Sequence, residues 1–180
     1  YPCGGLRCGK IPQGQDDHKG IMMYHTRSEA ETLALARRVA EHLSGGEVLL
    51  LQGELGAGKT TFVRGLAKAL GIRARIKSPT FTLMHVHRLA TGKGLRAKSS
   101  QSLRPTPYAI RYLIHCDAYR IKRARELEDI GLMDYIGRSD TVVVVEWGEK
   151  IKPLIKWRGY LLIKFSHGGK PGERTISTNF

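Results

Sequence analysis

Gly53-Glu-Leu-Gly-Ala-Gly58-Lys59-Thr60 is the stretch that decides the fold of this sequence, because it matches the pattern G-x-x-x-x-G-K-[ST]. Before it, Glu47–Leu51 ends in the apolar run Val-Leu-Leu-Leu, which is typical of a buried parallel strand. After it, Lys59–Leu70 repeats apolar residues at helical spacing and is followed by Gly71. A glycine-rich turn between a strand and a helix points successive backbone N–H groups at one phosphate. The stretch therefore predicts a nucleoside triphosphate site.

Individual residues of this loop have distinct expected roles. We expect Lys59 to reach the β- and γ-phosphates and Thr60 to offer its hydroxyl to Mg²⁺. The only asparagine of the chain is Asn179, so the N-K-x-D motif with which small GTPases recognise guanine does not occur, and ATP is the favoured nucleotide. The loop residues expected to contact ATP are Leu55, Gly56, Ala57, Gly58, Lys59, Thr60 and Thr61.

Two carboxylates stand where a phosphate-binding loop needs a second acidic group. Asp117 ends the apolar segment that begins at Tyr112, and Glu146 follows the run Val142–Val145. Both would lie at the carboxyl edge of a parallel sheet, where ligands bind in folds of this class. One of the two would hold the metal or its waters while the other orients the attacking water, and spacing alone does not assign these roles.

The sequence outside the loop predicts further helices and strands. Ser28 and Glu31 form a capping-box pattern at the start of a helix. Strand-like composition recurs in Thr80–Val86, Tyr112–Cys116, Tyr160–Phe165 and Arg174–Ser177. A Gly-Gly turn between the last two segments indicates that they form a hairpin at the sheet edge. A short helix is expected around Glu126–Ile130. The predicted fold class is α/β, a P-loop NTPase-like, mostly parallel sheet flanked by helices, with a C-terminal antiparallel hairpin.

Two segments do not fit this alternation. Residues 1–21 are polar and glycine-rich, and we interpret them as a flexible leader to a single domain spanning 22–180. Arg88–Arg111 contains six Lys/Arg, two prolines and no acid, which favours a basic loop insertion.

Composition excludes several classes of protein. With 180 residues, 41% of them hydrophobic and 26% charged, the chain suits one globular domain and not a disordered one. Its apolar runs are too short to span a membrane, and its start carries no apolar secretory segment. Three cysteines indicate neither a disulfide framework nor a zinc site. We therefore expect a cytoplasmic protein.

Positive charge is concentrated in one part of the chain. The net charge is +14, and Arg73–Arg125 holds thirteen Lys/Arg against one acid, Asp117. Such a segment would attract a phosphate polymer or an acidic protein face, although a solvated surface explains the same composition. A contact with tRNA through this basic segment is one expectation.

Five motifs in order resemble those of the TsaE (YjeE) family. They are Gly53–Thr61, Ser78-Pro-Thr-Phe-Thr82, His115-Cys-Asp-Ala-Tyr-Arg120, Glu126-Leu-Glu-Asp-Ile-Gly131 and Val144-Val-Glu-Trp-Gly-Glu149, and the resemblance spans roughly Met22 to Ser177. The resemblance implies an ATPase that works with the TsaD–TsaB pair, which places threonylcarbamoyl on adenosine 37 of tRNAs reading ANN codons. Two departures stand out: Arg88–Arg111 replaces a short, partly acidic hairpin, and Cys116 replaces a larger apolar residue.

The resemblance also implies roles for single residues. Lys59 and Thr60 would bind phosphate and magnesium, Glu146 would be a magnesium ligand, and Asp117 would be needed for activity. Thr80 would lie in a switch-like segment. Thr26 and Lys170 match positions that contact adenine.

Chemistry leaves two other functions open. A small-molecule kinase uses the same loop but needs an acceptor pocket and a lid, for which Arg88–Arg111 is the one candidate. A nucleic-acid-binding module with a vestigial nucleotide site would explain the charge. No arginine is evidently fixed beside the loop, apart from Arg120 as a possible charge stabiliser, so we expect slow hydrolysis that a partner raises.

Overall fold

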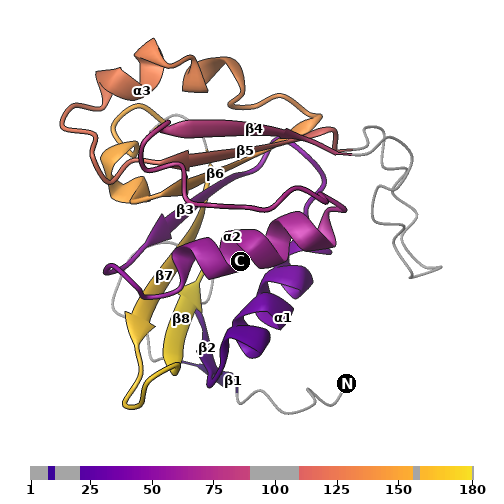
Figure 1. The fold of residues 1–180 in the computed structure, drawn as a ribbon, viewed down its shortest axis with the longest axis vertical. Helices are drawn as coiled ribbons and strands as arrows, with labels where there is room; N and C mark the ends of the chain where they lie inside the picture. The colour runs from indigo at the N-terminus through magenta and orange to yellow at the C-terminus, as the bar shows by residue number, and fades with distance from the viewer. Residues whose placement is uncertain (1–7, 11–20, 90–109, 156–158, 180) are drawn as a thin grey trace.

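Eight strands form one sheet in the order β1-β2-β8-β7-β3-β6-β5-β4 (Figure 1). The computed structural model describes residues 8–10, 21–89, 110–155 and 159–179. The strands are β1 (Cys8–Lys10), β2 (Met22–Thr26), β3 (Val48–Gln52), β4 (Met84–Arg88), β5 (Tyr112–Asp117), β6 (Thr141–Glu146), β7 (Leu161–His167) and β8 (Arg174–Thr178). The helices are α1 (Glu29–Ala40), α2 (Lys59–Ala69) and α3 (Arg125–Asp129), with the 3₁₀ turns η1 (Leu132–Asp134) and η2 (Gly148–Lys150).

Parallel pairing is confined to the centre of the sheet. β3 pairs in parallel with both β6 and β7, and β6 pairs in parallel with β5. Every residue of β6 is buried, which fits a strand covered on both faces. The outer pairs are antiparallel. On one side β4 pairs with β5, and on the other the pairs are β1 with β2, β2 with β8, and β8 with β7. The predicted α/β class with a parallel centre and a C-terminal hairpin is confirmed.

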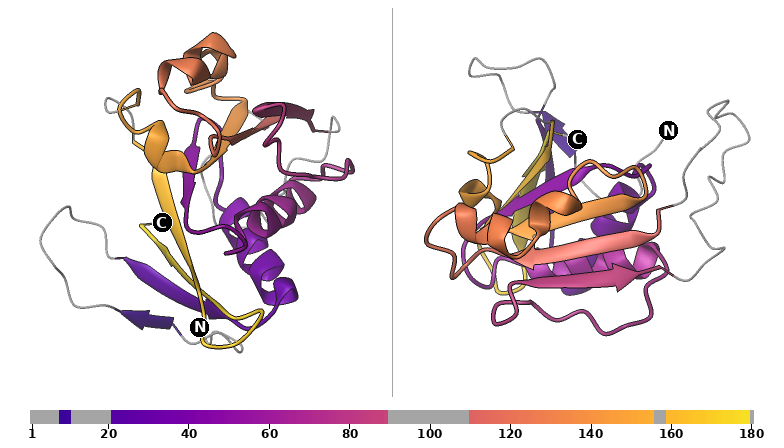
Figure 2. Two further views of the ribbon diagram at one scale, coloured as in Figure 1. Left: turned by 60° about the vertical axis from the view of Figure 1, so that its left-hand side comes forward. Right: turned by 90° about the horizontal axis from the view of Figure 1, so that it is seen from above.

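Different elements cover the two faces of the sheet (Figure 2). On one face α1 and α2 pack on the sheet through buried side chains such as Leu35, Phe62 and Leu66. On the other, α3 and η1 contribute Leu127 and Leu132, and Ile151 follows η2 directly. Two apolar layers therefore hold the central strands rigid at the edge where the phosphate-binding pattern lies. Among the described residues, no helix is long and apolar enough to cross a membrane.

The two long helices begin in different ways. At α1 the Ser28 hydroxyl accepts the Glu31 N–H (3.2 Å) and the Glu31 carboxylate accepts the Arg27 N–H (2.8 Å), so the predicted capping pattern is confirmed. At α2 the residue before the first turn is Gly58, in a left-handed conformation and without a side-chain cap. The free N–H groups of α2 therefore remain available to an anion.

Two expectations about the strands need correction. The C-terminal hairpin does not lie at the sheet edge, because β8 pairs with β2, which the sequence did not predict. Thr80–Val86 is extended only from Met84, because Leu83 has a φ of 62° that ends the preceding turn. Within the segment interpreted as a flexible leader, Cys8–Lys10 pairs with β2 as β1, and the interpretation itself stays a prediction.

Most of the basic insertion lies outside the described residues. Its ends are described: Arg88 closes β4, and the Leu89 N–H donates to the Arg111 carbonyl (2.8 Å). The two described ends of the insertion therefore lie side by side at the edge of the sheet.

Candidate functional site

The loop between β3 and α2 takes its shape from glycines. Gly53, Gly56 and Gly58 have φ angles of 142°, 76° and 101°, which other residues rarely adopt. At Gly53 an added Cβ would also lie 2.3 Å from the Phe165 carbonyl oxygen. Conformation and close approach together explain why the pattern requires glycine there.

Lys59 is buried inside the curve of this loop. Its Nζ donates to the carbonyls of Gly53 (2.7 Å) and Glu54 (2.8 Å), and it lies 4.2 Å from the centre of the Trp147 ring. Burial lowers the pKa of Lys59, and the negative charge of Glu146 opposes that shift. The ammonium group is thus held by dipoles and a ring face, in a place where an anionic ligand would gain a strong partner.

Glu146 joins the end of β6 to the loop. Both carboxylate oxygens accept the Thr60 hydroxyl, at 2.9 and 3.0 Å. His115 Nε2 lies 2.9 Å from Oε1, and both side chains are buried. The structure therefore brings together the two predicted magnesium ligands, Thr60 and Glu146, and adds a histidine.

Asp117 ends β5 and is the register partner of Glu146 on β6. Its Oδ2 accepts the hydroxyls of Ser78 (2.5 Å) and Thr80 (2.6 Å), and its Oδ1 accepts the Tyr119 N–H (2.9 Å). The two hydroxyls also lie 2.7 Å apart. Thr80 and Asp117, predicted from separate motifs, thus form one cluster.

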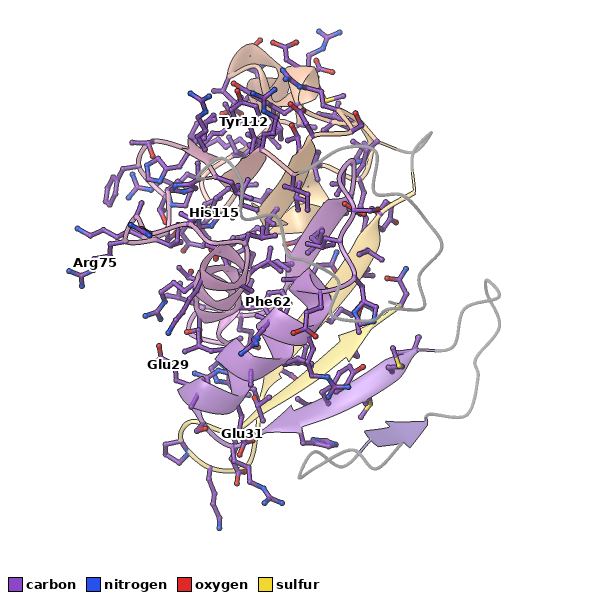
Figure 3. The ribbon with its side chains drawn as sticks, turned by 90° about the vertical axis from the view of Figure 1, so that its right-hand side faces the viewer. Glu29, Glu31, Phe62, Arg75, Tyr112 and His115 are labelled. Carbon is purple, nitrogen blue, oxygen red and sulfur yellow. The ribbon has the colours of Figure 1, made fainter. Side chains whose placement is uncertain are left out.

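Sequence reasoning missed two members of these clusters, Ser78 and His115. Each stands inside a motif that was quoted for its other residues. His115 (Figure 3, labelled) precedes Asp117 by two positions on β5, so both side chains lie on the same face of the sheet. That spacing was the available signal for His115.

The other predicted nucleotide contacts lie around the loop in different environments. Leu55 is exposed, Ala57 is buried, and the Thr61 hydroxyl accepts a hydrogen bond from Arg64 (3.0 Å). Thr26 is buried at the end of β2 with its hydroxyl 3.0 Å from that of Thr32. Lys170 is exposed in the β7–β8 turn, and the described contacts do not connect it with the loop.

Two side chains of the hairpin approach the loop. His167 Nε2 lies 3.2 Å from the Leu55 carbonyl oxygen, and a Cβ on Gly58 would lie 2.4 Å from Arg174 Nε. That Nε is buried and has no hydrogen-bond partner among the described residues, while Nη1 donates to the Gly172 carbonyl (2.7 Å). The expectation that no arginine is fixed beside the loop is therefore wrong, because strand pairing brings Arg174 there from far along the chain.

Comparisons with known proteins agree with the resemblance of the motifs. A family model described as "Threonylcarbamoyl adenosine biosynthesis protein TsaE" matches residues 26–176. A Streptomyces coelicolor protein named "tRNA threonylcarbamoyladenosine biosynthesis protein TsaE" is 40% identical over 77% of this chain and 82% of its own. The protein of the same name from Aquifex aeolicus is 38% identical over 70% of this chain and 76% of its own. The one from Bacillus subtilis is 35% identical over 73% of this chain and 69% of its own.

One solved structure is similar over nearly the whole fold. The crystal structure of Bacillus subtilis YdiB matches with a TM-score of 0.63 and 28% identity. The match covers 91% of this chain and 87% of that one.

Proposed function

Because the chain belongs to the TsaE family of tRNA threonylcarbamoyladenosine biosynthesis, we propose that it is a magnesium-dependent ATPase that acts with the TsaD–TsaB pair. The observation that carries this proposal is the hydrogen bond between Thr60 and the buried Glu146 carboxylate, in the same loop region as the buried Lys59 side chain. An activity on tRNA also implies the cytoplasm as its compartment.

The donor set of the site fits ATP and Mg²⁺. Thr60 and Glu146 offer hydroxyl and carboxylate oxygens, the ligands that Mg²⁺ prefers, and they already lie within hydrogen-bond distance of each other. When bound, magnesium would neutralise charge on the phosphates. Lys59 would leave the carbonyls of Gly53 and Glu54 for phosphate oxygens, and the N–H groups at the start of α2 would bind the remaining ones.

We assign different roles to the two carboxylates. Glu146 belongs on the metal side, because it is bonded to Thr60 of the phosphate loop. Asp117 is free of that bond and faces Ser78 and Thr80, so we assign it the attacking water. Arg174, whose Nε has no hydrogen-bond partner among the described residues, would supply a further positive charge beside Gly58.

Exposed apolar side chains near the site favour a protein partner. Leu55 is 76% exposed on the loop, and Phe81 is 83% exposed in the segment that holds Thr80. The Arg120 guanidinium lies 4.4 Å from the Phe81 ring centre. A partner that covers these side chains would order the segment around Asp117 and raise the rate.

The test is phosphate release by the purified protein with and without Mg²⁺ and the TsaD–TsaB pair. We expect slow, Mg²⁺-dependent release that the pair accelerates. A phosphorylated small molecule in place of free phosphate would identify a kinase instead. ATP affinity that is unaffected by Lys59→Ala would remove the phosphate loop from the function.

A further inference from the structure

A hollow lies between the C-terminal end of α2 and β4. It consists of two adjoining cavities of about 580 and 380 Å³, which share the wall Gly71, Ile72, Arg73 and Ala74. The first extends along α2 and the second along the edge strand β4. We call the two together the basic groove.

Every charged side chain among the described residues that line the basic groove is positive. Lys68 comes from α2, Arg73 and Arg75 from the connection after it, and Arg88 from β4. Within the described part of the chain none of these four forms an ion pair, and Arg75 projects into solvent (Figure 3). Arg64, a fifth lining cation, is paired with Glu29 at 3.2 Å. Four exposed cations that lack a protein counter-charge require a ligand or solvent ions to balance them.

The groove is separate from the nucleotide site. α2 begins at Lys59 in the phosphate loop and ends at Ala69 beside the groove. Eleven helical residues put the two ends of α2 about 16 Å apart. A ligand in the groove would therefore lie outside the reach of Lys59 and Glu146, on the same face of the sheet.

The chemistry of the lining favours a phosphodiester chain. Arginine predominates, and its planar guanidinium binds phosphate oxygens in pairs, better than the compact ammonium of lysine does. The cations are distributed over two adjoining cavities that reach from α2 to β4, as a chain of phosphates would require. None of the described residues that line the two cavities is a tyrosine, tryptophan or phenylalanine, so these residues offer no ring for stacking on bases.

We propose that the basic groove binds the phosphodiester backbone of RNA, without reading its sequence. RNA is favoured over an acidic protein face because the family acts in tRNA modification and because arginine predominates. The inference does not depend on ATP hydrolysis.

The experiment measures binding of an unmodified tRNA transcript to the full chain by fluorescence anisotropy over a series of salt concentrations. The groove variant is Arg73→Glu/Arg75→Glu. The control is Lys122→Glu/Arg125→Glu, which makes the same charge change at exposed residues beside α3, on the other face of the sheet. We expect the groove variant to lose affinity at least about tenfold at low salt, with the salt slope reduced by about 2. The control is expected to stay within about threefold of the wild type.

Two results would overturn the proposal. Equal losses in the two variants would mean that affinity follows net charge and not the groove. Wild-type binding of polyglutamate that is as tight as that of tRNA, and is lost in the groove variant, would assign the groove to an acidic protein. An unchanged thermal unfolding temperature and an unchanged ATP affinity would show that the groove variant is folded. The Lys59→Ala variant should keep its RNA affinity whether or not the chain hydrolyses ATP.

Discussion

The ends of β5 and β6 carry one carboxylate each, side by side in register, but the two regions differ in what holds the acid. Glu146 is bonded to Thr60 at the start of α2 and approached by His115, both on regular elements. Asp117 is bonded to Ser78 and Thr80, which lie on an irregular connection between α2 and β4. One acid is therefore tied to the rigid sheet and helix, and the other to a segment that has to be positioned.

Under the proposed function, this difference would allow the two neighbouring carboxylates to take different roles. The position of Glu146 depends on elements with two buried apolar layers behind them. The position of Asp117 depends on a turn that ends at Leu83, where a φ of 62° is unfavourable for a residue with a side chain. We infer that the metal side of the site is preformed and that the water side responds to contacts on the segment from Ser78 to Leu83.

The largest expected effect comes from Lys59→Ala, which acts on both regions at once. Loss of the buried ammonium should lower ATP affinity by more than about 1000-fold, because its charge-assisted hydrogen bonds to phosphate would be lost. Isothermal titration of ATP measures this. The fold should persist, since the Lys59 ammonium contacts two loop carbonyls and the face of the Trp147 ring, and its removal takes no apolar side chain out of the core. Near-normal affinity would contradict a role in binding.

Glu146→Gln tests the carboxylate that is tied to the rigid sheet and helix. ATP should still bind, while Mg²⁺ dependence weakens and turnover falls by about 1000-fold, because an anionic metal ligand is lost. Magnesium titrations of turnover measure both effects. If the apparent magnesium affinity does not change, Asp117 is the metal-side carboxylate and the assignment is reversed.

Asp117→Asn tests the water side. We expect turnover to fall about 100-fold at unchanged magnesium and ATP affinity, as for loss of a positioned general base. Single-turnover hydrolysis at saturating Mg²⁺ measures the chemical step. A variant whose activity returns on raising Mg²⁺ would place Asp117 on the metal.

Ser78→Ala and Thr80→Ala test the two hydroxyl groups that hold Asp117, and each is expected to have a smaller effect. Each removes one hydroxyl from Asp117 Oδ2 and should lower turnover about tenfold. In an Asp117→Asn background the same substitutions should cost little, because the groups act through one carboxylate. Additive losses in this double-mutant cycle would show that the hydroxyls act independently of Asp117.

The smallest effect concerns Cys116, between His115 and Asp117 on β5. Its thiol is fully buried, and burial raises its pKa to about 12. At pH 8 the thiolate fraction is therefore on the order of a thousandfold below that of a free cysteine. Alkylation followed by peptide mapping should find Cys116 unmodified until the protein unfolds. Rapid labelling in the native protein would mean that the end of β5 opens, contrary to a preformed edge.

Local patterns predicted the parts of the fold that depend on neighbouring residues. The phosphate loop, the buried strands around Leu50 and Val144, and the cap of α1 at Ser28 all follow from residues within a few positions of each other. Each is determined by glycine conformation, burial on two faces, or a side-chain cap.

What the sequence did not reveal depends on pairing between distant segments. β2 carries no distinctive pattern, and its place follows from backbone bonds to β8. Arg174 reaches Gly58 only because β8 lies in the sheet between β2 and β7, and Ser78 meets Asp117 only when the turn before β4 forms. Lys170, assigned by resemblance alone, keeps no described contact with the loop, so its role stays a prediction.

The pairing of β2 with β8 has a consequence for synthesis on the ribosome. His25 and Thr175, whose side chains lie 3.1 Å apart, are separated by 150 positions, so a nascent chain carries β2 long before its partner is translated. The phosphate loop, Asp117 and Glu146 all emerge earlier than the hairpin that brings Arg174 to Gly58 and holds Thr26 in place. Contacts of such high sequence separation form late in folding. The growing chain therefore passes through a stage in which the loop before α2, Asp117 and Glu146 are all present, but Arg174 has not yet been brought to Gly58.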